Sequence, residues 1–229
     1  MAQPIVERRT DTDRPPRMTF EEFLAWVPDG KQAEWVDGEV FILTASARHV
    51  RLSRLLVNLL SSFVALFDLG EVFPAPFLMR ATPGGPGREP DILVLLTANL
   101  DRVKRLGIEG PADFVVEFLS DETATTDLIR KYREYEAAGV AEYVLIDARD
   151  GRHGFAFHQL DDQGHYAPVT ADTEGRFHST VLPGFWLDPR WFDLDPLPSA
   201  EDLLLDITPE AYVAWIAEKR RQREAGVEH

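Results

Sequence analysis

The segment Glu89-Pro90-Asp91-Ile92-Leu93-Val94-Leu95-Leu96 places a carboxylate directly before a run of apolar residues. A second acid, Glu117, lies inside another apolar run, Asp113-Phe114-Val115-Val116-Glu117-Phe118-Leu119-Ser120. Each run has the length and composition of a buried β-strand. An ionised carboxylate is costly to bury unless it is paired or holds a metal. If the two strands are neighbours, the acids predict a divalent-cation site.

A candidate cation follows the second acid along the chain. Lys131 lies in a segment that Thr125 or Thr126 can start as a helix and that Gly139 can end. The next apolar run, residues 141–147, completes a strand–helix–strand unit, which predicts a parallel pair in a central sheet. Two buried acids with a lysine on the following helix indicate metal-assisted cleavage of a phosphodiester.

The segments before the first acid carry clear local signals. Thr19 and Glu22 form a capping box that predicts a short helix to about Val27. Asp37-Gly38 suits the tight turn of a hairpin. Ser46 can cap a long helix, whose buried face is predicted from leucines and a phenylalanine at helical spacing: Leu52, Leu55, Leu56, Leu59, Leu60, Phe63 and Leu66.

The remaining segments predict the rest of the sheet. Residues 71–80 read as a strand, but Pro74 and Pro76 place it at an edge or break it. A short helix is expected within residues 97–111, an antiparallel extension over 153–187, and an amphipathic helix over 209–224. The fold class is therefore α/β, or mixed α+β. It has a central mixed sheet flanked by helices and an antiparallel C-terminal extension.

Composition limits the functions to consider. The 229 residues contain no cysteine, which excludes a disulfide framework and a thiolate metal site. A net charge of −15 argues against broad, non-specific nucleic-acid binding. Arg48, Arg51 and Arg54 recur at every third residue, and the simplest interpretation is a solvated helix face. No apolar stretch is expected to reach transmembrane length and no signal core is found, so we expect a cytoplasmic protein without a membrane partner.

The order of several short motifs resembles the Uma2 family of bacterial endonuclease-like proteins, in the PD-(D/E)XK, restriction-endonuclease-like superfamily. The resemblance runs from about Met18 to Asp188. The matching pieces lie in this order: residues 18–23, 34–39, His49, 89–91, 115–120, Asp127, Lys131, Tyr135, 138–140, 142–143 and Asp147.

The resemblance implies a role for each site residue. Asp91 corresponds to the acid of the "PD" half and Glu117 to that of the "(D/E)XK" half. Position 119 is Leu119 where a lysine is expected, and Lys131 on the following helix would replace it. Glu34 and His49 stand where family members also carry an acid and a histidine. The implied domains are a flexible tail over 1–17, a nuclease-like domain over 18–195 and a helical segment over 196–229.

The chemistry of these residues suits Mg²⁺ or Mn²⁺, because hard cations prefer oxygen ligands. Asp91 and Glu117 would hold the ion, Glu34 would be a further ligand, and Lys131 would orient the attacking water. Simpler interpretations stay open: Asp91 can cap a turn, His49 can be a surface residue, and Lys131 by itself resembles a surface lysine of a helix.

The leading function is a Mg²⁺-dependent endonuclease that cuts DNA. The alternative is a catalytically silent binding or regulatory module of the same fold, which the acidic charge favours. A weaker third interpretation is a metal-dependent enzyme acting on a phosphorylated small molecule. The sequence does not separate DNA from RNA. It leaves a homodimer open, since nucleases that cut both strands are often dimers.

Overall fold

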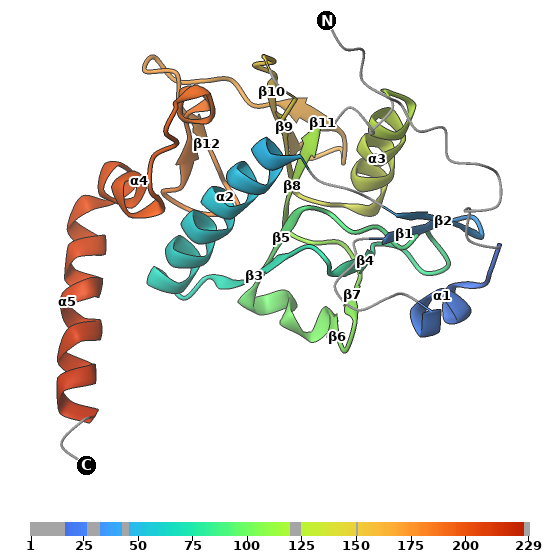
Figure 1. The fold of residues 1–229 in the computed structure, drawn as a ribbon, viewed down its shortest axis with the longest axis horizontal. Helices are drawn as coiled ribbons and strands as arrows, with labels where there is room; N and C mark the ends of the chain where they lie inside the picture. Colours follow the sequence, from blue (N-terminus) through green and yellow to red (C-terminus); the bar gives the residue numbers. More distant parts are fainter. Residues whose placement is uncertain (1–16, 27–32, 43–45, 120–124, 150, 227–229) are drawn as a thin grey trace, which may run out of the picture.

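In a computed structural model, residues 17–26, 33–42, 46–119, 125–149 and 151–226 are described, and they build up around one six-stranded sheet (Figure 1). The strand order is β11-β10-β9-β8-β5-β3. The strands are β3 (Gly70–Pro74), β5 (Ile92–Leu96), β8 (Phe114–Leu119), β9 (Glu142–Asp147), β10 (Phe155–Leu160) and β11 (Tyr166–Pro168). Only β8 and β9 pair in parallel within this sheet. The predicted mixed sheet is confirmed.

Helices cover both faces of this sheet (Figure 1). Even-numbered residues such as Val94 and Val116 pack with the leucines of α2 (Ala47–Leu66). Odd-numbered residues such as Leu93 and Val115 pack with Tyr135 of α3 (Thr125–Ala138). Side chains alternate between the two faces of a strand, so strands buried on both faces read as continuous apolar runs.

The expectation that no apolar stretch reaches transmembrane length is wrong for α2. This 20-residue helix is long and apolar enough to cross a membrane by length and composition alone. Its apolar side, however, contains Leu52, Leu56, Leu59 and Phe63, all fully buried against the sheet. A helix of the protein core can have the same length and hydropathy as a membrane span, and the burial of α2 is that of a core helix.

The local signals at the start of the chain form as predicted. The side chain of Thr19 accepts from the Glu22 N–H at 3.2 Å, and that of Glu22 accepts from the Thr19 N–H at 2.7 Å, which starts α1 (Phe20–Trp26). The hairpin of β1 (Ala33–Val36) and β2 (Glu39–Ile42) turns at Asp37 and Gly38, with φ of 49° and 87°. Glycine accommodates such a φ without steric cost. The Ser46 side chain caps α2 by accepting from the N–H of His49.

The segment around the prolines was expected to lie at an edge or to be broken, and it does both. β3 lies at the edge of the large sheet, whereas β4 (Leu78–Arg80) belongs to a separate three-stranded sheet with β6 (Val103–Lys104) and β7 (Gly107–Glu109). The short helix expected within 97–111 is the 3₁₀-helix η2 (Thr97–Arg102). The β6–β7 hairpin after it was missed, because two- and three-residue strands carry almost no periodicity.

The C-terminal third adds the expected antiparallel strands, since β10 pairs with β9 and β11 with β10. A two-stranded sheet of β12 (Phe177–His178) and β13 (Trp186–Leu187) follows, then the 3₁₀-helix η3 (Pro189–Asp193). The helices α4 (Ala200–Ile207) and α5 (Pro209–Gly226) end the chain, and α5 extends away from the body (Figure 1). The predicted tail falls almost wholly on residues 1–16, outside the described residues, and the domain boundaries stay predictions.

Candidate active site

Strand register brings the two predicted acids to the same end of the sheet. β5 and β8 are antiparallel with Ile92 opposite Val116, so one step further along this register Asp91 lies opposite Glu117. Both side chains are buried, each residue being 5% exposed. Oδ2 of Asp91 accepts a hydrogen bond from the backbone N–H of Phe118 at 2.8 Å. This bond ties the start of β5 to the residue that follows Glu117.

Lys131 reaches this pair from α3. Its Nζ donates to both carboxylate oxygens of Glu117 at 3.1 Å and lies 2.8 Å from Oε1 of Glu34. Only 3% of the residue is exposed, so the interpretation of Lys131 as a surface lysine is wrong. A helix thus supplies the cation that the strand lacks at Leu119.

Tyr135, one helical turn after Lys131, completes the surroundings of Glu117. Its hydroxyl donates to Oε1 of Glu117 at 2.7 Å. Burial raises the pKa of Glu117 to about 7, and the charges of Asp91 and Glu34 act in the same direction. The charge of Lys131 and the hydrogen bond from the Tyr135 hydroxyl oppose this rise. The neutral form of Glu117 is therefore favoured more than that of a carboxyl in water.

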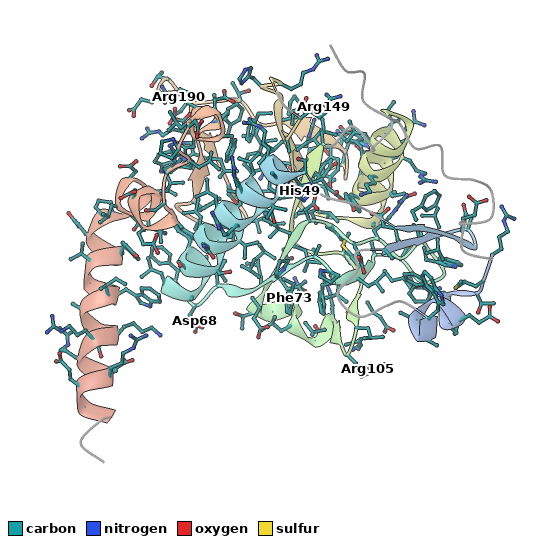
Figure 2. The ribbon with its side chains drawn as sticks, viewed as in Figure 1. His49, Asp68, Phe73, Arg105, Arg149 and Arg190 are labelled. Atoms are coloured by element: carbon teal, nitrogen blue, oxygen red, sulfur yellow. The ribbon has the colours of Figure 1, made fainter. Side chains whose placement is uncertain are left out.

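His49 lies in the first turn of α2, next to the sheet (Figure 2). Its Nε2 is 3.1 Å from Oδ1 of Asp91, and its ring packs on that of Phe118 with centroids 5.1 Å apart. Burial acts to lower the pKa of His49, but the hydrogen bond and charge of Asp91, together with Glu117, raise it above its ordinary value. With 12% of its side chain exposed, His49 is not the plain surface residue of the simpler interpretation.

Glu34 enters from the β1–β2 hairpin, and a second cation holds it there. Arg88 donates from one terminal nitrogen to Oε2 of Glu34 at 2.8 Å, and from two other nitrogens to Glu134 of α3 at 2.8 and 2.9 Å. The charges alternate along a chain of contacts from Glu134 through Arg88, Glu34 and Lys131 to Glu117. Glu34 thus links the two cations.

Glu89 joins the hairpin to the same cluster. Its Oε2 accepts from the N–H of Ala33 at 2.7 Å. Burial raises the pKa of Glu89 to about 7; the Ala33 N–H and the charge of Lys131 oppose this, and the charge of Glu34 adds to it. Glu89 and Glu117 are thus two buried carboxyls of one cluster that both titrate near neutrality.

Sequence reasoning brought together all five candidates, since Asp91, Glu117, Lys131, Glu34 and His49 meet in one buried cluster. It gave no role to Arg88, Glu89, Glu134 or Tyr135. Tyr135 was visible as one of the family motifs, one turn after the lysine. Arg88 follows a Gly- and Pro-rich loop, and nothing in its spacing shows that its side chain points inward. The roles of the five candidates stay predictions.

The oxygen donors of Asp91 and Glu117 are of the kind that Mg²⁺ and Mn²⁺ prefer. Within the described ranges, no three His, Cys, Asp or Glu side chains are arranged as a metal-binding group. A hard ion would then be held by Asp91 and Glu117, with backbone or solvent oxygens completing its shell. Glu34 lies between Lys131 and Arg88 and pairs with both cations, and its role as a further ligand, directly or through water, stays a prediction.

A mixed sheet that carries two acids at adjacent strand ends, with a lysine on the next helix, defines a nuclease-like protein of the restriction-endonuclease-like class. A sequence model of the Uma2 family, described as "Putative restriction endonuclease", matches residues 20–190, and the chain belongs to this family. A similar solved structure is that of a putative nuclease belonging to DUF820 from Anabaena variabilis ATCC 29413. It has a TM-score of 0.60 and 17% identity over 76% of this chain and 97% of that chain, a likeness that shows the fold. No curated protein matches the chain.

Proposed function

We propose that the chain is an endonuclease that hydrolyses phosphodiester bonds in DNA with the help of Mg²⁺ or Mn²⁺. The observation that carries the proposal is the convergence of Asp91, Glu117 and Lys131 within one buried cluster. Each of these buried charges is costly to remove from water, and clusters of such groups are typical of functional sites.

The proposed division of labour follows from the contacts. Asp91 and Glu117 would hold the ion, which when bound polarises the phosphoryl group and lowers the pKa of a water molecule. Lys131 donates two hydrogen bonds to Glu117. It would orient the attacking water and offset the charge that develops on the phosphoryl oxygens. His49 keeps Asp91 oriented through Oδ1, while the Phe118 N–H holds Oδ2.

One observation favours the second candidate, a silent binding or regulatory module. Both oxygens of each acid already have protein partners: His49 and the Phe118 N–H for Asp91, Lys131 and Tyr135 for Glu117. A bound ion would have to share or displace some of these contacts. The net charge of −15 also weakens attraction to DNA.

Supercoiled plasmid incubated with Mg²⁺, with Mn²⁺ or with chelator separates the two candidates. Glu117→Gln keeps the size of the side chain and removes the charge that would hold the ion, so nicking should disappear. Glu109→Gln, at an exposed position of β7, is the matched control and should cut like the wild type. Cleavage that persists in Glu117→Gln or in excess chelator would refute the mechanism. A wild type that cuts no DNA with either ion would favour the silent module.

A further inference from the structure

Two hollows adjoin along α2. The first, about 290 Å³, is lined by His49 and Asp91 and by Arg54 and Asn58 further along the helix. The second, about 690 Å³, lies between α2 and the segment from Asp193 to Glu201. Arg54 and Asn58 line both hollows. Arg54 and Asn58 therefore form a shared wall between the hollow at the candidate active site and the hollow that extends toward α4.

Arg51, Arg54 and Asn58 form one stripe on the exposed side of α2, which we call the α2 stripe. Their spacing of three and four residues places them on the same face of a helix. All three residues are exposed, and among the described residues neither arginine forms an ion pair. Arg48 differs, because it donates to the carbonyl of Phe192 at 3.0 Å and so connects α2 to η3. The α2 stripe thus presents two cations that no fold contact uses.

The charge of the second hollow is divided between its two walls. Asp193, Asp195 and Glu201 line the side opposite α2. Asp193 has two neighbours on this side, since Nδ1 of His153 lies 2.6 Å and a terminal nitrogen of Arg48 3.6 Å from its Oδ1, and the charge of Arg48 offsets part of its own. Phosphates would be repelled by Asp195 and Glu201 and attracted by the α2 wall. An anionic chain in this groove is therefore confined to the helix side, which continues to His49 and Asp91.

We propose that the α2 stripe binds the sugar-phosphate backbone of the DNA strand beside the phosphate to be cut. The inference rests on the proposed function and assigns its DNA-binding surface. Arg51 and Arg54 are separated by about 4.5 Å along the helix axis, and each side chain is long and ends in a fork of donors that suits phosphate. The two guanidinium groups can thus reach neighbouring phosphates, and the Asn58 amide can donate to the next.

Binding to a short fluorescein-labelled DNA duplex, measured by anisotropy in chelator over a range of NaCl concentrations, tests this assignment. The double variant Arg51→Gln/Arg54→Gln should bind more weakly. Its slope of log K against log salt should be shallower by about 1.8, since each phosphate contact contributes about 0.9. Lys104→Gln/Arg105→Gln changes the net charge equally at exposed positions of another hollow, and should keep the wild-type slope. Arg51→Lys/Arg54→Lys should keep most of the affinity.

Several results would overturn the proposal: no measurable binding by wild type, an unchanged slope in Arg51→Gln/Arg54→Gln, or an equal loss in the Lys104 and Arg105 control. Equal thermal melting of all variants shows that the changes act on binding. The proposed function fails separately. A wild type that binds through the α2 stripe but cuts nothing with Mg²⁺ refutes the nuclease alone. If the wild type cuts DNA and Arg51→Gln/Arg54→Gln binds DNA as the wild type does, only the proposed role of the α2 stripe is refuted.

Discussion

Replacing Arg88 by methionine should destabilise the protein more than any change on its surface. Arg88 is 2% exposed and holds Glu34, also 2% exposed, at 2.8 Å. Methionine keeps a flexible apolar stem but leaves Glu34 a buried charge without its guanidinium partner, 2.8 Å from Lys131 Nζ. Removing one partner of a buried ion pair costs about 3–5 kcal/mol. For a protein of this size each kcal/mol shifts Tm by about 2–4 °C, so a fall of roughly 6–20 °C is expected.

Urea unfolding followed by tryptophan fluorescence, together with a thermal melt, measures this loss. Arg220→Met is the control, because Arg220 pairs with Glu224 on the surface of α5 with 80% of its side chain exposed. Its midpoint should stay close to that of the wild type, since exposed pairs contribute little. An Arg88→Met midpoint as close to wild type as that of Arg220→Met would refute the reasoning.

A double-mutant cycle separates the effect of losing the ion pair from the effect of losing the packing of the Arg88 side chain. Glu34→Gln/Arg88→Met removes the charges at both ends of the contact, so no buried carboxylate at position 34 lacks its guanidinium partner. The double variant should lose less free energy of unfolding than the sum of the two single variants, by roughly 0.5–3 kcal/mol. Strict additivity would mean that the two side chains do not act on each other.

Three further predictions concern the acids and the lysine. Mg²⁺ or Mn²⁺ should raise Tm in wild type but not in Asp91→Ala, because an ion that binds only the native state stabilises it; an equal rise in both proteins would place the ion elsewhere. The pKa values of Glu89 and Glu117 are raised to about 7 in the fold, so the native state holds protons that the unfolded state has released. Their contribution to the free energy of unfolding should be full below about pH 4.5 and should be lost as the pH rises to about 7. In this window the urea midpoint of Glu117→Gln should depend less on pH than that of the wild type. Lys131→Ala should lower the turnover of plasmid more than the affinity for Mn²⁺, because Lys131 is not a ligand, and an equal loss of both would contradict its proposed role.

The sequence located the longer helices and strands and the two acids. Apolar runs, capping residues and turn residues act within a few positions, so the strands around Asp91 and Glu117, the helix before Gly139 and the hairpin at Asp37-Gly38 could all be located. The burial of Glu117 could also be predicted, because neither face of the strand Phe114–Leu119 is open to solvent when both faces are covered. The displaced lysine required the family resemblance in addition.

Only the tertiary structure decided which groups surround those acids. The contacts of Arg88 with Glu34 and Glu134 join a hairpin, a loop and a helix that are far apart in the chain. The inward direction of Lys131 depends on how α3 lies across β8. The short β6–β7 hairpin pairs through β7 with β4, a strand far from it in the chain. Local patterns encode periodicity and turns, whereas side-chain pairing depends on the packing of whole elements. The fold class could therefore be predicted from the sequence, whereas the ion pairs that connect Glu134, Arg88, Glu34, Lys131 and Glu117 could not.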